Sequence, residues 1–466
     1  MKTIIFFVCI VFSLNISAQL PEQNFEGILS QDNQTLRFYF KTQLINNKYI
    51  TELYLPEQLL FAKKATMTEI EHDTIRIHFR DFQAQYIGQI KADELFIDGN
   101  WIQRGVALPL KLYFKDSQSA ISFDRPQEPK VPFSYISKEI NIYNSKDKLY
   151  LCGTLTLPDT LQKHTLAILI TGSGPQNRNE ELAGHKPFLV IADYLTRNGI
   201  AVFRYDDRGV GKSTGDFTTA TTLDFMKDAL VIVDYFKKST YINRDNIGLI
   251  GHSEGGIVAM MAAAKNRKGI AYVVSLAGLG VPSIDLLLRQ TEDILRASGA
   301  EEDHIELVRA INFQLYNLAL TIKNPDSLMK NLQPFLKEVT SGLTEEEINQ
   351  FGFSDQIIKT AAMQLFTPWM KFFLAIKPSE YIAKIKCPVL ALNGSLDIQV
   401  SATENLEAIE RYLKEAKNKN FKTQTLPGLN HLFQKAEKGT INEYMMIQET
   451  FNEEALRLIV QFIKER

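Results

Sequence analysis

The segment Gly251-His252-Ser253-Glu254-Gly255 places a serine between two glycines where a strand must turn sharply into a helix. The apolar run Ile247–Ile250 comes directly before it, and the helix-like run Ile257–Ala264 follows. Glycines two residues before and after the serine tolerate the strained dihedrals of such a turn and let the strand pack against the helix. The context therefore predicts a nucleophile elbow with Ser253 as a catalytic serine, rather than a plain packing turn.

A serine hydroxyl is a weak nucleophile at neutral pH, so it needs a base and a carboxylate that orients the base. Only two of the seven histidines, His304 and His431, follow Ser253. His304 lies in a charged, helix-like stretch, which is typical of a solvated surface residue. His431 ends the loop Pro427–His431 after the strand-like run Lys422–Leu426, and loops at strand ends carry catalytic groups. We expect His431 to be the base.

Six aspartates follow Ser253, and only Asp397 comes just after a buried-strand pattern, Pro388–Asn393, and a turn. The others lie in polar, helix-like surroundings where a solvated charge is the default. Asp397 is therefore the predicted acid. The alternative is a cap for the helix that begins near Ser401, although Ser401 and Thr403 suit that purpose better.

The oxyanion of a tetrahedral intermediate needs two backbone N–H donors. One is expected from Glu254, the residue after the nucleophile, at the start of the helix. The second is expected from the loop Thr171–Pro175, which follows the strand-like run Leu166–Ile170. Ser173 is the predicted donor and Gly174 competes with it, while a plain Gly/Pro turn remains the alternative reading of this loop.

These motifs together resemble a bacterial, esterase-like branch of the α/β-hydrolase superfamily that carries an extra N-terminal β domain. The resemblance covers about residues 135–466 and rests on ordered segments: Gly172–Gln176, Arg204–Ser213, Gly251–Gly256, Asn393–Asp397 and Gly428–His431. It implies hydrolysis of carboxylic esters with Ser253, Asp397 and His431 as the triad, without a metal or cofactor. It leaves the acyl chain length and the alcohol of the substrate open.

The chain of 466 residues is too long for one compact core, so two or more units are expected. Its formal charge of −2 gives no basic field for nucleic acid. Asp206, Asp207 and Arg208 precede Gly209–Ser213, which lacks the first glycine of a phosphate loop, so we expect a structural charge cluster there. Cys152 and Cys387 have no zinc-ligand spacing and are expected to be buried apolar residues.

Residues 1–18 have the pattern of a secretory signal peptide: Lys2, the apolar run Ile4–Leu14, and a cleavage site after Ala18. The run is too short for a permanent transmembrane helix, whereas an uncleaved anchor is the alternative. The pattern predicts a periplasmic or secreted protein with no stable membrane insertion after removal of the leader.

Residues 19–124 show period-two alternation and turns, which predict a small all-β domain, a sandwich or barrel. In it, Trp101 could stack on a sugar, although a lone tryptophan is usually part of the core. The proline-containing segment 125–132 is the predicted linker. From 133 to 466, strands alternate with helices, which predicts an α/β-hydrolase fold, a mainly parallel sheet flanked by helices, with a helical cap inserted at about 280–385.

The predicted function is that of a serine esterase that cleaves carboxylic esters through an acyl-enzyme, with esters of short acyl groups as the expected substrates. A thioesterase or a peptidase with the same triad is an alternative, and a carbohydrate-binding protein with a silent hydrolase domain is another. The expected partner is a small-molecule or oligosaccharide ester substrate, with no nucleic acid. The sequence does not give the oligomeric state, the job of the β domain or the purpose of the Glu254 side chain.

Overall fold

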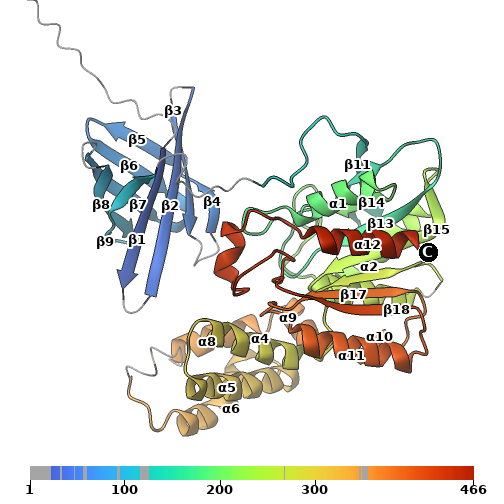
Figure 1. Cartoon of the computed structure of the whole chain (residues 1–466). Coiled ribbons are helices and arrows are strands. Elements are labelled where there is room, and N and C mark those ends of the chain that lie inside the picture. The colour runs from blue at the N-terminus through green and yellow to red at the C-terminus, as the bar shows by residue number, and fades with distance from the viewer. Residues whose placement is uncertain are drawn as a thin grey trace, which may run out of the picture. The chain divides into compact units, whose positions relative to one another are not determined.

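The computed structural model describes residues 23–31, 34–46, 48–55, 60–91, 95–115, 125–266, 268–345, 348 and 355–466 (Figure 1). The chain divides into two compact units, Met1–Ser122 and Phe123–Arg466, and each is described by itself. The predicted leader and its cleavage site after Ala18 lie outside the described residues. The segment 125–132, predicted as a linker, belongs to the larger unit.

The smaller unit is an antiparallel β half-barrel, as expected for an all-β domain. Its strands follow the order β4-β3-β2-β1-β10-β8-β7-β6-β5, and β9 pairs with β8. The strands are β1 Gln23–Gln31, β2 Gln34–Ile45, β3 Lys48–Leu55, β4 Leu60–Lys64, β5 Met67–Glu71, β6 Thr74–Phe79, β7 Ala84–Lys91, β8 Phe96–Gln103, β9 Val106–Pro109 and β10 Leu112–Lys115; the 3₁₀ helix η2 is Arg80–Phe82.

Alternation along these strands fills the interior of the half-barrel. On β6, Ile75, Ile77 and Phe79 are buried, while the intervening residues are less so, because successive side chains point to opposite faces of a strand. The sheet curls until β5 and β3 approach, since Thr68 Oγ1 donates to Thr51 Oγ1 at 2.9 Å. This curvature gives the small unit a core of its own.

The larger unit is built on an eight-stranded sheet in the order β11-β12-β14-β13-β15-β16-β17-β18. Neighbours from β14 onward are parallel, and β12 is antiparallel to both β11 and β14. The strands are β11 Ile136–Asn144, β12 Leu149–Leu157, β13 His164–Ile170, β14 Ala201–Tyr205, β15 Ile242–His252, β16 Val273–Leu276, β17 Val389–Gly394 and β18 Phe421–Leu426. Cys152 and Cys387 are free thiols: Cys152 lies on β12 and is buried as expected, whereas Cys387 lies just before β17 and is only partly buried.

Helices cover both faces of this sheet, so its central strands are apolar throughout rather than alternating. On β13, Leu166, Ile168 and Ile170 enter the core beneath α2 and α3, whereas Ala167 and Leu169 enter the core beneath α1 and α12. The flanking helices are α1 Pro187–Arg197, α2 Thr222–Phe236, α3 Glu254–Lys265, α11 Ala402–Glu415 and α12 Glu453–Lys464, with the 3₁₀ helix η4 at Ile441–Met446. The predicted α/β-hydrolase fold is confirmed.

Between β16 and β17 the described chain is helical, as expected for a cap. The helices are α4 Ser283–Ala297, α5 Glu302–Thr321, α6 Pro325–Val339, α8 Asp355–Gln364, α9 Pro368–Leu374 and α10 Ser379–Ile382 (Figure 1). Most of them share a separate apolar core that includes Leu315, Leu328 and Leu332. Within the described parts of the chain, no helix is both long and apolar enough to span a bilayer.

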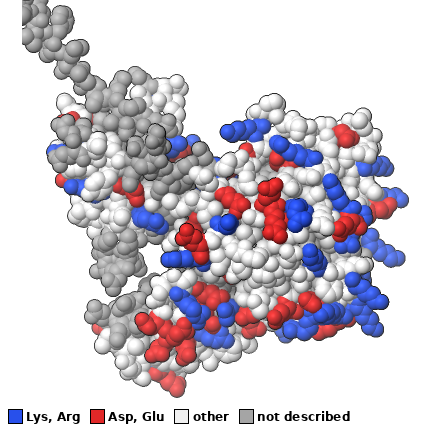
Figure 2. Space-filling model, in the orientation of Figure 1, with Lys and Arg blue, Asp and Glu red and all other residues white. Residues whose placement is uncertain are grey.

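Charged side chains of both signs are mixed over the visible face of the larger unit (Figure 2).

The segment that precedes β11 is bound to the rest of the larger unit by hydrogen bonds. Arg125 Nη2 donates to the carbonyl of Met445 at 2.7 Å, and Gln127 Nε2 donates to that of Phe451 at 2.7 Å. Gln127 Oε1 also accepts from the N–H groups of Thr450 and Phe451. These bonds hold the chain's entry into the larger unit against the loop before α12.

Candidate active site

Ser253 lies at a strained turn between β15 and α3. Its backbone angles are φ 52° and ψ −119°, a conformation that side-chain-bearing residues rarely adopt. A Cβ on Gly251 would lie 1.9 Å from the carbonyl oxygen of Gly255, and one on Gly255 would lie 2.2 Å from that of Ile170. Both glycines are therefore required by close backbone packing, which is the physical reason for the spacing seen in the sequence.

Asp397 and His431 lie in the loops that follow β17 and β18, and their side chains meet. His431 Nδ1 is 2.8 Å from Asp397 Oδ2, and both residues are buried. The other carboxylate oxygen of Asp397 accepts from the N–H groups of Gln399 and Val400, at 2.8 and 2.9 Å. The carboxylate is thus fixed on one side by the backbone and on the other side by the imidazole.

His252, the neighbour of Ser253 in the chain, connects the elbow to the His431 loop. Its Nε2 lies 2.9 Å from the carbonyl oxygen of His431, and the two imidazole rings are 4.8 Å apart. Its Nδ1 lies 3.0 Å from Glu180 Oε1. The three predicted residues Ser253, Asp397 and His431 thus follow the carboxyl ends of β15, β17 and β18, which are parallel strands of one sheet with β16 between β15 and β17.

Glu180 and Asp207 hold the loop that follows β13 against the elbow. Glu180 Oε1 accepts the N–H of Gly172 at 2.7 Å, and Asp207 accepts from Thr171 Oγ1 at 2.9 Å and from Gln176 N at 3.0 Å. A Cβ on Gly172 would lie 3.3 Å from the Cβ of Ser253, so the loop passes directly beside the serine. Because Glu180 occupies the Gly172 N–H, the next residues, Ser173 and Gly174, are left as candidate oxyanion donors.

The residues Asp206, Asp207 and Arg208 serve three separate networks rather than one cluster. Asp206 Oδ2 pairs with Arg178 Nη2 at 2.7 Å, whereas Asp207 anchors the loop after β13. Arg208 donates to both carboxylate oxygens of Asp228 at 2.7 Å. Neighbours in a sequence can point in different directions from a strand end, which is why the prediction of a single cluster is wrong.

Burial by itself lowers the pKa of His252 and raises the pKa of Asp207, two ionisable groups near the elbow. Burial disfavours the charged form of His252, but the adjacent Glu180 carboxylate outweighs this and raises the pKa of the imidazole above its ordinary value. Burial also raises the pKa of Asp207 well above that of a free aspartate, in spite of the hydrogen bonds from Thr171 and Gln176. A site that perturbs several groups in this way is typical of a catalytic centre.

Comparisons with known proteins find similar hydrolases. A protein-family model described as serine aminopeptidase S33 matches residues 186–297. The esterase EstD of Thermotoga maritima is 24% identical over 319 residues, which are 67% of this chain and 64% of EstD. The match thus spans less than two thirds of that relative's length. The chain belongs to the α/β-hydrolase superfamily.

Two further proteins are similar to parts of this chain. An acyl transferase of Shewanella hanedai is 28% identical over 243 residues, or 51% of this chain and 70% of that protein. The solved esterase Pf2001 of Pyrococcus furiosus is 18% identical, covers 71% of this chain and 92% of its own, and has a TM-score of 0.41. The similarity to EstD and the match to the family model confirm the predicted resemblance to esterase-like α/β-hydrolases.

Sequence reasoning missed the partners of the Glu254 side chain in this α/β-hydrolase. Its carboxylate is buried and accepts from Thr222 Oγ1 at 2.6 Å, from Trp369 Nε1 at 2.9 Å and from the side chain of Ser173. Thr222 begins α2, Trp369 belongs to cap helix α9, and Ser173 belongs to the loop beside the elbow. Glu254 thus ties the cap, α2 and the predicted oxyanion loop to the first residue of α3.

The described residues contain no group of three or more His, Cys, Asp or Glu side chains placed to hold a metal ion. The carboxylates nearest to the elbow are already engaged: Glu180 with Gly172 and His252, Asp207 with Thr171, and Asp397 with His431.

Proposed function

We propose that this α/β-hydrolase is a serine esterase that cleaves carboxylic esters through an acyl-enzyme, with Ser253, His431 and Asp397 as its triad. The observation that carries the proposal is the hydrogen bond of 2.8 Å between His431 Nδ1 and Asp397 Oδ2, next to a serine held at a strained elbow. The similarity to EstD, which is named an esterase, supports the proposal.

In the proposed mechanism, Asp397 accepts a hydrogen bond from the Nδ1–H of His431, which fixes the tautomer whose unprotonated Nε2 can act as a base. Nε2 takes the proton of Ser253 Oγ as the oxygen attacks the ester carbonyl carbon. His431 then gives that proton to the leaving alcohol as the carbon–oxygen bond of the ester breaks. Water, activated by the same imidazole, attacks the acyl-enzyme and releases the carboxylic acid and the free serine.

The negative charge that develops on the carbonyl oxygen would be held by two backbone N–H groups, those of Glu254 and of Ser173. The Glu254 N–H lies at the start of α3, where the helix dipole favours an anion. Gly174 stays the competitor for the second donor. The Glu180–Gly172 and Asp207–Thr171 bonds support this proposal because they fix the backbone of the loop before any substrate binds.

The test is the turnover of p-nitrophenyl acetate, butyrate and octanoate by the wild type and by Ser253→Ala. We expect measurable wild-type turnover and a fall in kcat of about 10³-fold or more in the variant. Ser275→Ala is the matched control, because Ser275 on β16 is buried beside the elbow and its Oγ lacks a hydrogen-bond partner among the described residues. This control should keep its turnover.

A peptidase is the second candidate, because the matching family model is described as a serine aminopeptidase. Leucine p-nitroanilide, assayed beside the esters, separates the two activities. Serine-dependent turnover of the anilide at a higher kcat/KM than that of every ester would replace the esterase with a peptidase. A folded wild type that is inactive on all of these substrates would instead favour a binding protein.

We also propose that the chain is exported, on the basis of the leader pattern in residues 1–18. Expression of the full chain in a bacterial host should give a periplasmic protein whose first residue is Gln19. N-terminal sequencing checks this. A cytoplasmic product that retains Met1 or Lys2 would contradict export.

A further inference from the structure

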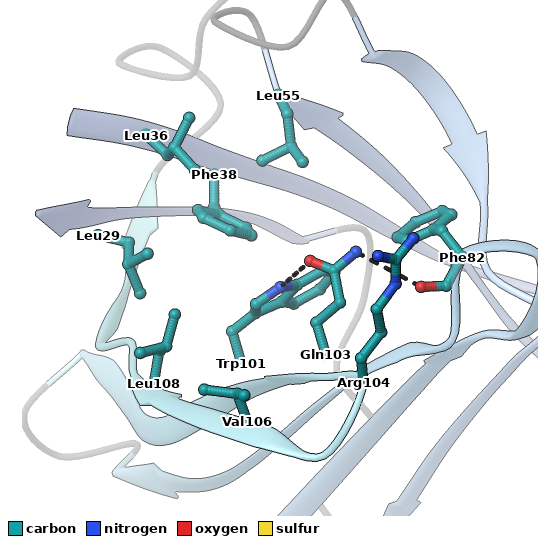
Figure 3. A pocket seen from close by; sticks show the side chains of 10 residues that line it. All are labelled: Leu29, Leu36, Phe38, Leu55, Phe82, Trp101, Gln103, Arg104, Val106 and Leu108. Atoms are coloured by element: carbon teal, nitrogen blue, oxygen red, sulfur yellow. Dashed lines mark hydrogen bonds between the residues drawn. The ribbon is translucent and has the colours of Figure 1, made fainter. Parts of the chain in front are cut away.

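The half-barrel of the smaller unit contains a cavity of about 590 Å³. This volume lies within the range of about 300–1,000 Å³ that is usual for small-molecule sites. Figure 3 shows Leu29, Leu36 and Leu108 at one end, and Phe82, Gln103 and Arg104 at the other. The cavity is therefore amphipathic: its two polar side chains, Gln103 and Arg104, lie at one end, and the other end is lined by leucines.

Trp101 lines the cavity, is packed against Phe38, and has its indole N–H engaged in a hydrogen bond. Trp101 is 4% exposed and packs edge-on against Phe38, with ring centroids 5.0 Å apart. Its Nε1 donates to Gln103 Oε1 at 3.4 Å, and Gln103 Nε2 donates to the carbonyl of Phe82 at 3.4 Å. The indole thus offers apolar surface, which suits an alkyl chain better than a hydroxyl-rich sugar.

Arg104 supplies a cation at the mouth of this cavity. Arg104 and Gly105 form the turn between β8 and β9, with φ values of 49° and 84°. A two-residue hairpin of this kind needs positive φ at both positions, for which Asn-Gly is the favoured sequence. The Arg104 N–H also donates to the carbonyl of Gln83 at 3.1 Å, which fixes the turn beside η2.

The Arg104 guanidinium is exposed, and no side chain among the described residues forms an ion pair or a hydrogen bond with it. A left-handed backbone position is an unfavourable place for an arginine, and no ion pair within the described part of the half-barrel uses its charge. A cation beside an apolar cavity is complementary to a ligand with an alkyl chain and an anionic end.

We propose that the half-barrel binds a single-chain alkyl carboxylate, an anion of the fatty-acid type. Its chain lies against Leu29, Leu36 and Leu108, and its carboxylate faces the guanidinium of Arg104. The apolar lining supplies affinity through burial of the chain, and the charge-assisted hydrogen bond selects the carboxylate end. This site is separate from the proposed triad and does not depend on the esterase proposal.

The experiment is a calorimetric titration of the full chain with decanoate, decan-1-ol and decyltrimethylammonium below their micelle concentrations. Arg104→Asn removes the cation and leaves the turn Asn-Gly, so the hairpin is expected to fold at least as well. Arg76→Asn is the matched control, because Arg76 lies on β6 of the same unit and does not line the cavity.

We expect decanoate to bind at one site, Arg104→Asn to weaken this binding by about tenfold, and Arg76→Asn to leave it unchanged. Decan-1-ol should bind the wild type and Arg104→Asn equally, and decyltrimethylammonium should bind more weakly than decanoate. The proposal is overturned if decanoate shows no saturable binding, if Arg104→Asn binds it as tightly as the wild type, or if the ammonium compound binds as well as the carboxylate.

A second measurement, of tryptophan fluorescence, tests whether decanoate binds in the half-barrel or at the proposed active site. The chain has two tryptophans, so Trp369→Phe leaves Trp101 as the one fluorophore of its kind. Decanoate should change the emission of Trp101 in this background with the same affinity that calorimetry gives. Saturable heat without a change in Trp101 emission would place the ligand elsewhere and contradict the proposal.

Discussion

Two carboxylates flank the elbow and have different surroundings. Asp397 is held by backbone N–H groups and faces His431, whereas Glu254 is buried among Thr222, Trp369 and the side chain of Ser173. The first arrangement orients an imidazole. The second arrangement gathers donors from three parts of the fold around the Glu254 carboxylate, so its hydrogen bonds hold those parts in place relative to one another.

Replacing Asp397 by Asn should impair catalysis far more than folding. The amide keeps the shape of the carboxylate but cannot fix the His431 tautomer or stabilise its charged form, so kcat on p-nitrophenyl butyrate should fall by about 10³–10⁴-fold. Steady-state kinetics at neutral pH measure this. Asp245→Asn, at a highly exposed position, is the control, and a loss no larger than in that control would rule out Asp397 as the acid.

Glu254→Gln should change how stability depends on pH. Burial raises the pKa of Glu254 above its ordinary value of 4.5, although hydrogen bonds from Thr222, Trp369 and Ser173 oppose the shift. Between the unfolded and folded pKa values the folded state binds more protons, so wild-type stability falls as pH rises through that window. The Tm of Glu254→Gln minus that of the wild type should therefore increase above about pH 4.5.

Thermal melts of both proteins across this pH range provide the measurement. A difference in Tm that stays flat would mean that the pKa of Glu254 is the same in both states. A difference that decreases with pH would mean that the folded protein stabilises the carboxylate, which is opposite to our expectation.

At the scale of the element, the unit formed by β15, the elbow and α3 determines where the serine lies. Its conformation depends on backbone contacts that only glycine permits at positions 251 and 255. This explains why a short sequence pattern was sufficient to predict the elbow: the pattern is the direct consequence of the packing.

Gly255→Ala should destabilise the larger unit by about 3 kcal/mol or more, because its Cβ would meet the backbone oxygens of Ile170 and Thr171. Gly299→Ala is a control with φ of 84° and open space around the new Cβ, and it should cost about 1 kcal/mol. Urea denaturation measures both free energies of unfolding. Equal effects would mean that the elbow accommodates the methyl group.

The strands, and the loops that carry Ser253, Asp397 and His431, could be predicted because buried parallel strands are continuous apolar runs that end in polar loops. The contact of Trp369 with Glu254 could not be predicted from the sequence, because it depends on the path of the cap helices across more than a hundred residues of chain. The separate roles of Asp206, Asp207 and Arg208 were also missed, since neighbouring side chains diverge at a strand end. The sequence indicated the type of each element better than the partners of its polar groups.

At the scale of the whole molecule, the chain combines two units with separate cores. The core of the half-barrel includes Phe38, Phe40 and Trp101, and it shares no residue with the cores beneath the helices of the larger unit. All of the proposed catalytic residues belong to the larger unit. Alternation predicted the smaller unit as all-β, but the cavity inside it depends on how the sheet curls, which alternation does not define.

Residues 123–466 expressed alone should therefore keep the turnover of p-nitrophenyl butyrate within about threefold of the full chain, because small substrates need only the larger unit. The kcat/KM values of the two proteins are compared, with circular dichroism as a check on folding. A folded fragment without turnover would show that the half-barrel takes part in catalysis on small esters.

The most direct test of the central claim is covalent labelling with a fluorophosphonate, which reacts with serines activated by a neighbouring base. Peptide mass spectrometry of the labelled wild type should find the adduct on Ser253, and His431→Ala should abolish the labelling while the protein stays folded. An adduct on a different serine, or undiminished labelling of Ser253 in His431→Ala, would contradict the account.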